Sequence, residues 1–243
     1  MIATIKQALM KDGRRSDLVN HRFFSRIRNS PDLDREQVTR FLGQWWHPLH
    51  YFPTFLSRLV SNLRDLEMKT AVSKILWEEL GEGNPERAHE RIYVDTMTTV
   101  GFAAESVNAA AALPATERLV QRYAEAANDC WSGLGFLYGT EVADLAMVSG
   151  IGTAVRRVTG EKQLPWVTIH AHQEPGHIAS AQDALPMEVS ESETRRIHEG
   201  AREMWSLWIA FFDALDHGMG QGAGHERATQ PQSPTGAGHE GTQ

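Results

Sequence analysis

Helical periodicity runs through almost the whole chain, and it constrains the fold more than any other feature of the sequence. From residue 1 to about residue 218, Ala, Leu, Glu, Arg and Met dominate, and apolar residues recur every three to four positions. This spacing lines one face of an α-helix with apolar side chains. No stretch alternates apolar and polar residues long enough to predict a β-strand. The sequence therefore predicts an all-α protein.

Short breaks divide this helical region into segments. They lie at residues 29–31, 81–85 and 113–114 and at Gly160. Gly, Pro and Asn, which are frequent at these breaks, end helices or form turns. We therefore expect a bundle of about seven helices with short connections, forming one domain over residues 1–218.

The last part of the chain has a different composition. Residues 219–243 are rich in Gly, Gln and Pro and contain no Leu, Ile, Val or aromatic residue. Such a segment cannot bury enough apolar surface to offset the entropy lost on ordering. The sequence therefore predicts a disordered tail.

Charge and cysteine content exclude several classes of function. The chain has 24 Lys and Arg against 31 Asp and Glu, a formal net charge of -7. Nucleic acids and anionic membranes bind basic surfaces, so we expect neither as a partner. Cys130 is the single cysteine and has no partner for an internal disulfide. With no apolar run typical of a signal peptide at the N-terminus, these features predict a reducing, cytoplasmic location.

The sharpest chemical signal is a group of three residues on one helical face. His170, Glu174 and His177 are spaced four and three residues apart within the helical segment at 166–185. Because a helix turns about 100° per residue, their side chains fall within about 60° of one another. Two imidazoles and a carboxylate form a ligand set that suits iron, manganese or zinc.

A second candidate lies where a run of glutamates precedes His89. Glu86 is three positions before it, Glu82 seven and Glu79 ten. If Pro85 begins a new helix, Glu86 and His89 share that helix, and Glu82 approaches from the preceding turn. A solvated charged face is the alternative interpretation of this run.

A third candidate is Glu141, which lies in the apolar segment at 133–148, with Asp144 three residues later. A carboxylate is costly to bury in such a helix unless it is paired or bound to a metal. Together, the three segments supply carboxylates and histidines from three separate helices. Helical bundles use this combination to hold two metal ions, so the sequence predicts a metal site.

These motifs, in this order, resemble those of the heme-oxygenase-like diiron oxidases and oxygenases, relatives of the TenA-type and pyrroloquinoline-quinone-synthase proteins. That family has about seven helices, with a Glu shortly before a His, a lone Glu on the next core helix, and His-x3-Asp-x2-His on a third. The resemblance covers about residues 15–215 and includes the aromatic segment at 44–59. Glu174 stands where the family usually has Asp.

The resemblance implies a set of metal ligands on this chain. They are Glu82, Glu86, His89, Glu141, His170, Glu174 and His177. As the first carboxylate we favour Glu86 and keep Glu82, with Glu79 as an additional candidate.

The resemblance also implies an activity. Two Fe²⁺ ions per chain, or one manganese and one iron, would use O2 as cosubstrate. Family reactions are N-oxygenation of amines, and oxidative C–C cleavage or desaturation of amino acids and fatty acids. We therefore expect a biosynthetic oxidoreductase acting on a small metabolite with an amino or carboxylate group. An external electron donor and a homodimer are the further partners considered, and His47 and His50 are the expected substrate contacts.

Three alternatives on the same fold stay open at this point. A thiaminase-like hydrolase would use Cys130 as its nucleophile, and a quinone-cofactor synthase would need no metal. A heme oxygenase would need an axial histidine near the N-terminus, where His21 is available. An interaction protein would bind the metal without substrate-dependent O2 consumption.

Overall fold

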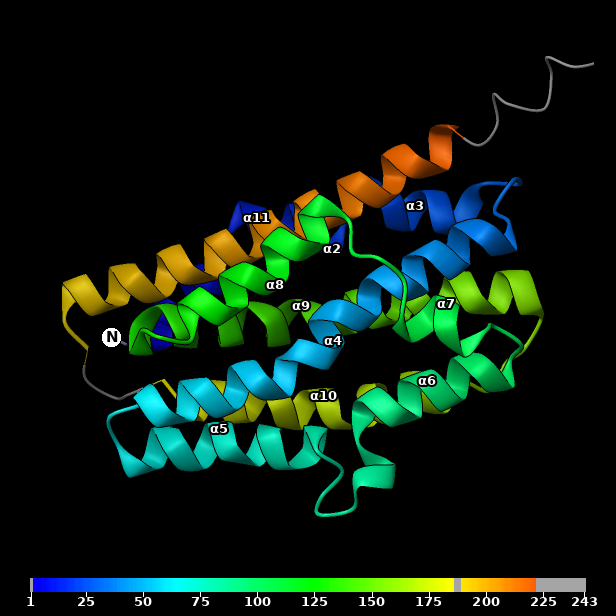
Figure 1. The fold of residues 1–243 in the computed structure, drawn as a ribbon. Coiled ribbons are helices and arrows are strands. Elements are labelled where there is room, and N and C mark those ends of the chain that lie inside the picture. Colours follow the sequence, from blue (N-terminus) through cyan, green and yellow to red (C-terminus); the bar gives the residue numbers. More distant parts are fainter. Residues whose placement is uncertain (1, 186–188, 222–243) are drawn as a thin grey trace, which may run out of the picture.

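The computed structural model describes residues 2–185 and 189–221, and in these residues it contains helices and no strands (Figure 1). The α-helices are α1 (Ile2–Met10), α2 (Gly13–Val19), α3 (Arg22–Asn29), α4 (Arg35–Asn62), α5 (Leu66–Glu79), α6 (His89–Thr99), α7 (Ala104–Asn108), α8 (Pro114–Ala126), α9 (Cys130–Thr159), α10 (Pro165–Asp183) and α11 (Glu191–Gln221). A 3-10 turn, η1 (Pro85–Arg87), precedes α6. The predicted all-α class is confirmed.

Seven of these helices are long and form the body of the bundle. They are α4, α5, α6, α8, α9, α10 and α11, each of at least 11 residues. The remaining four are short segments of 5 to 9 residues. Helix α11 continues to Gln221, three residues into the tail predicted from residue 219, and the rest of that tail lies outside the described residues.

Local sequence signals account for where the long helices begin and end. Asp34 caps α4 by accepting from the backbone N–H of Gln37 at 2.8 Å, and the Gln37 side chain accepts from the N–H of Asp34 at 3.2 Å. This reciprocal pair satisfies two backbone donors that a helix start leaves free. Helix α9 ends at Thr159 and is capped by Gly160, whose φ of 79° is a left-handed conformation that glycine adopts without strain.

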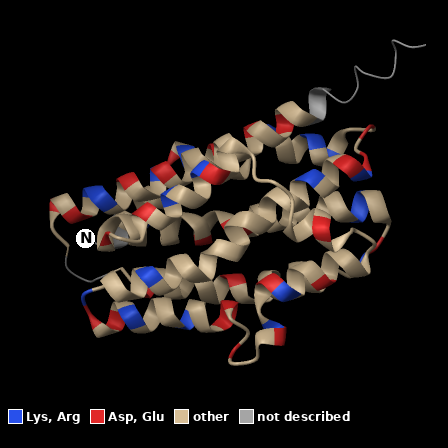
Figure 2. Ribbon diagram, viewed as in Figure 1, with Lys and Arg blue, Asp and Glu red and all other residues tan. Residues whose placement is uncertain are grey.

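Helix α9 is the core helix, and it packs against α11 on one side and α10 on the other (Figure 1). By length and composition alone it is apolar enough to cross a membrane, but 78% of its most apolar window is buried inside the bundle. Charged residues of both signs are interspersed along the helices instead of gathering on one element (Figure 2). A buried core helix of this kind can hold a polar residue only where neighbours satisfy it.

Glycines on α9 allow the backbone of α11 to approach closely. A Cβ atom on Gly135 would lie 2.3 Å from the carbonyl oxygen of Ile197, far inside contact distance. We expect Gly135→Ala to lower the free energy of unfolding by about 1–3 kcal/mol, because the two backbones must separate. Urea unfolding measures this effect. The control is Gly176→Ala in α10, whose new Cβ would meet nothing within 4 Å; equal stability of the two variants would contradict the prediction.

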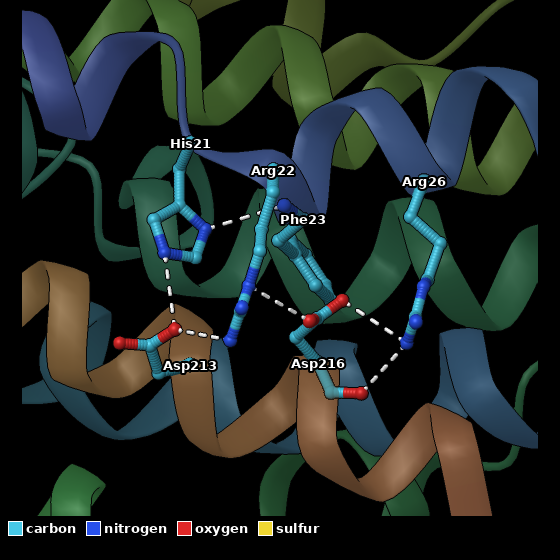
Figure 3. Close-up of polar contacts among 6 residues, drawn as sticks. All are labelled: His21, Arg22, Phe23, Arg26, Asp213 and Asp216. Carbon is cyan, nitrogen blue, oxygen red and sulfur yellow. Dashed lines mark hydrogen bonds and ion pairs between the residues drawn. The ribbon is translucent and has the colours of Figure 1, made fainter.

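A network of ion pairs ties α3 to α11 (Figure 3). Arg22 pairs with Asp213 at 2.8 Å and with Asp216 at 3.0 Å, and Arg26 pairs with Asp216 at 3.1 Å. The Nδ1 of His21 accepts from the second N–H of α3 at 3.2 Å, and its Nε2 lies 3.5 Å from Asp213. Burial lowers the pKa of His21. His21 therefore caps a helix with both ring nitrogens engaged, which does not suit an axial heme ligand.

Candidate metal centre

Four helices bring six histidine and glutamate side chains together in the core of the bundle. Glu79 is the last residue of α5, His89 is the first of α6, Glu141 lies near the middle of α9, and α10 supplies the other three. They form two groups: Glu79, His89 and His170; and Glu141, Glu174 and His177. Within each group, one ligand atom from every residue lies within 4.8 Å of the others, and all six residues are buried.

Glu79 faces both groups. Its Oε2 lies 3.0 Å from His89 Nδ1, and its Oε1 lies 3.9 Å from His177 Nδ1. The same nitrogen of His177 is 3.6 Å from Glu141 Oε2, whereas His177 Nε2 lies 2.9 Å from Glu78 Oε2 at the edge of the site. The two groups are therefore adjacent, and one carboxylate has an oxygen directed to each.

Several ligand atoms lack the hydrogen bonds that buried polar atoms normally make. His89 Nε2, both carboxylate oxygens of Glu174 and Oε1 of Glu141 are buried with no hydrogen-bond partner among the described residues, whereas His89 Nδ1 faces Glu79 Oε2 at 3.0 Å. Each such atom costs about 1–3 kcal/mol of stability. Bound cations would satisfy these atoms where they gather in one place. Imidazole and carboxylate donors suit iron and manganese, so the residues fit a pair of metal ions.

The orientation of His170 leaves one nitrogen available as a ligand. Its Nδ1–H donates to the carbonyl of Trp166, one turn earlier in α10, at 2.9 Å. This bond fixes the neutral tautomer in which Nε2 carries a lone pair. Burial lowers the pKa of His170 to about 4, so the ring stays neutral at physiological pH.

The second group carries more negative charge than its surroundings can balance. Burial, together with the carboxylates of Asp144 and Glu141, raises the pKa of Glu174 to about 12. Burial and Glu141 also raise the pKa of Asp144 to about 7. Burial acts to lower the pKa of His177, but the Glu141 carboxylate outweighs burial and raises this pKa to about 9. A divalent cation among these carboxylates would favour their charged forms.

The pKa of Glu79 is lowered, unlike the pKa values of the second group. Burial acts to raise its pKa, but the neighbouring His89 outweighs burial and lowers the pKa of Glu79 to about 2. Glu79 is therefore a carboxylate at any physiological pH, in position to accept a cation.

We expected Glu82 and Glu86 to face His89 in the metal site, but the structure places both on the surface. Glu82 pairs with Arg87 at 2.8 Å, and Glu86 pairs with Arg91. Glu86 lies in the 3-10 turn η1, and α6 begins only at His89, so the two residues do not share a regular helix.

A left-handed loop explains why Glu79 is the residue that reaches the centre. After α5 the chain turns through Gly81, Glu82 and Gly83, with φ angles of 82°, 56° and 86°. A Cβ on Gly81 would lie 2.2 Å from the carbonyl oxygen of Asn84, so the turn requires glycine there. This reversal brings the start of α6 back beside the end of α5 and places His89 next to Glu79.

A cavity of about 40 Å³ adjoins both groups. Its wall is formed by Trp45, Pro48, Leu49, Phe52, Glu79, Tyr123, Thr140, Glu141, Asp144, Trp166, His170, His177 and Trp208. These residues come from α4, α5, α8, α9, α10 and α11. The cavity places an apolar, largely aromatic space beside the ligands.

The predicted substrate contacts His47 and His50 do not line this cavity. His47 Nε2–H donates to the carbonyl of Ala110 at 2.9 Å, and His50 Nδ1 lies 2.9 Å from Glu90 Oε1. Both histidines line a separate surface groove between α4 and α8. The opposite face of α4, which carries Trp45, lines the cavity instead.

Cys130 is also remote from the cavity. It begins α9, eleven residues before Glu141, which corresponds to about 16 Å along a helix. Burial raises the pKa of its thiol, the opposite of what an activated nucleophile requires. Neither feature supports the thiaminase-like alternative.

Residues 39–209 match a protein family described as iron-containing redox enzymes, and the chain belongs to this family. No curated protein matches the sequence. Among solved structures, a domain of unknown function with a heme oxygenase-like fold from Shewanella denitrificans has a TM-score of 0.74 at 14% identity, covering 96% of this chain and 99% of that one. The heme-oxygenase-like fold expected from the motifs is confirmed.

Two further solved structures share this fold. A CADD-like protein of unknown function from Nostoc punctiforme has a TM-score of 0.73 at 14% identity, covering 89% of this chain and 95% of that one. A TenA homologue from Pseudomonas syringae pv. tomato has a TM-score of 0.71 at 14% identity, covering 88% and 93%.

Proposed function

We propose that this protein is a non-heme diiron enzyme that uses O2 to oxidise a small metabolite. The observation that carries the proposal is the pair of adjacent, buried three-residue groups. They contain three histidines and three glutamates, and several of their ligand atoms have no hydrogen-bond partner among the described residues. Membership of an iron-containing redox family supports iron over zinc. The reactions that we propose are N-oxygenation, or oxidative C–C cleavage or desaturation.

Each of the two groups of ligand residues would hold one ion. Glu79, His89 and His170 would hold one ion, and Glu141, Glu174 and His177 the other. Glu79 would contact both, because its two oxygens face different groups. Bound ferrous iron would supply the electrons that reduce O2, and an external donor would restore them after turnover.

The surrounding residues control what reaches the ions. The aromatic wall excludes bulk water, and the cavity of about 40 Å³ holds only a few molecules the size of water or O2. The carbonyl of Trp166 keeps the His170 ring oriented with Nε2 toward the centre. These contacts preorganise the site before metal or substrate arrives.

Anaerobic loading with ferrous iron tests the proposal. We expect two irons per chain, a transient visible absorbance on mixing with oxygenated buffer in a stopped-flow spectrometer, and faster decay of that absorbance with substrate. The control is Glu86→Gln, which removes a surface carboxylate and leaves both groups intact. One tightly bound zinc with no response to O2 would contradict the proposal and favour a cofactor-independent enzyme or an interaction protein.

A further inference from the structure

Glu78 lies at the edge of the metal centre and belongs to neither ligand group. It comes just before Glu79 at the end of α5. Successive side chains on a helix point about 100° apart, so the two glutamates face different directions. The Glu79 side chain is 4% exposed and enters the centre, whereas the Glu78 side chain is 17% exposed and faces His177, with Oε2 2.9 Å from Nε2. Glu78 therefore joins a buried ligand to the edge of the bundle.

The two ring nitrogens of His177 face in different directions. Nδ1 lies 3.6 Å from Glu141 Oε2 and 3.9 Å from Glu79 Oε1, which belong to the carboxylates that would hold the ions. Nε2 faces Glu78 instead. A histidine that binds a metal is neutral, with a proton on one nitrogen and a lone pair on the other. A hydrogen bond from Nε2–H to Glu78 would therefore leave the lone pair of Nδ1 directed at the ion.

The arrangement at His170 is the reverse of this one. Its Nδ1–H donates to the carbonyl of Trp166 at 2.9 Å, so Nε2 is the nitrogen that faces the centre. Both histidines lie on α10, but the acceptor for His170 belongs to the same helix, whereas the acceptor for His177 comes from α5. The orientation of His177 therefore depends on a side chain of a second helix.

We propose that Glu78 is a positioning residue, which accepts a hydrogen bond from Nε2–H of His177 and so directs Nδ1 to the ion of the second group. The inference rests on the proposed function for the presence of that ion. A hydrogen bond to the remote nitrogen of a ligating histidine fixes the tautomer and the rotation of the ring. Loss of such a partner lowers metal affinity by about 10- to 100-fold.

Titration of the metal-free protein with Co²⁺ measures this effect without O2 chemistry, because Co²⁺ accepts the same imidazole and carboxylate ligands and has a visible absorption. Glu78→Leu keeps a side chain of similar size and removes the acceptor, so we expect Co²⁺ affinity to fall about 10- to 100-fold. Glu78→Ala should lose affinity to the same extent. Glu78→Gln retains an oxygen that can accept from Nε2–H, and we expect its affinity to stay within about threefold of the original.

Proton NMR of the Co²⁺-loaded protein gives a signature that packing alone would not change. The ring N–H of a ligating histidine is shifted far from the other resonances by the paramagnetic ion, and it is observed only if a hydrogen bond slows its exchange with water. We expect one such resonance in the original protein and in Glu78→Gln that is lost from both Glu78→Leu and Glu78→Ala.

The matched controls are Glu67→Leu and Glu67→Gln, at an exposed glutamate on the same helix, and neither should change the affinity or the shifted resonances. Unchanged Co²⁺ affinity in Glu78→Leu and Glu78→Ala would overturn the inference. An equal loss in Glu78→Gln and Glu78→Leu would make Glu78 itself a metal ligand and would overturn it too.

The experiment separates this inference from the proposed function. If Co²⁺ binding depends on Glu78 as expected but the iron-loaded protein consumes no O2, the positioning role stands and the oxidase function fails. If iron-dependent O2 consumption is found and all Glu78 variants bind Co²⁺ equally well, the function stands and the inference fails. A protein that binds neither metal would overturn both.

Discussion

Replacing Glu79 with alanine is expected to reduce iron content from two ions per chain to one or none, and to lower iron-dependent O2 consumption by at least about 100-fold. The reason is its position: its two oxygens face His89 and His177, so one substitution removes a ligand atom beside each group. Iron analysis and an oxygen electrode measure the two effects. Far-UV circular dichroism checks that the helices remain.

Glu82→Gln and Glu86→Gln are the matched controls, because they remove neighbouring glutamates that pair with surface arginines. Both are expected to bind two irons and to change the free energy of unfolding by no more than about 0.5 kcal/mol. Loss of iron from Glu86→Gln together with full iron in Glu79→Ala would refute this assignment of the first carboxylate.

Metal removal is expected to make stability strongly dependent on pH between about pH 6.5 and 8.5. The raised pKa values of about 12 for Glu174 and about 9 for His177 mean that the folded, metal-free protein holds protons in this range that the unfolded chain has already lost. Stability must then fall as pH rises, by about 1.4 kcal/mol per pH unit for each proton. His170 and Glu79, whose pKa values are lowered, titrate below this window.

Thermal unfolding with and without metal measures this linkage. For a chain of this size we expect the metal-free Tm to fall by at least about 3 °C per pH unit across the window. Metal ions replace these protons, so the loaded protein should have a higher Tm and a smaller pH dependence, and the difference should widen with pH. A constant difference at all pH values would show that the buried carboxylates are not the metal ligands.

The regular part of the site could be predicted from the sequence because it lies on one uninterrupted helix. His170, Glu174 and His177 keep the spacing of an ideal helix even across Pro175, and the structure brings all three to the core. Glu141 was identifiable because an acid in a long apolar helix needs a partner. The helical class followed from periodicity alone.

The irregular part could not be predicted in the same way. Spacing along one helix favoured Glu86 and Glu82, but the left-handed turn that contains Glu82 breaks the helix and returns the chain to Glu79. His47 and His50 lie away from the cavity for a different reason. The face of α4 that lines the cavity follows an i, i+3, i+4, i+7 pattern, formed by Trp45, Pro48, Leu49 and Phe52. Both histidines lie outside this pattern, so they do not face the cavity.

Helix α10 supplies residues to both ligand groups, since His170 belongs to one and Glu174 and His177 to the other. An ion bound in either group would fix the rotation of α10 and so position the ligands of the second group. The affinities of the two ions are then coupled, and each strengthens the other by the same factor. At limiting iron, the population should therefore consist mainly of empty and fully loaded chains, with few carrying a single ion.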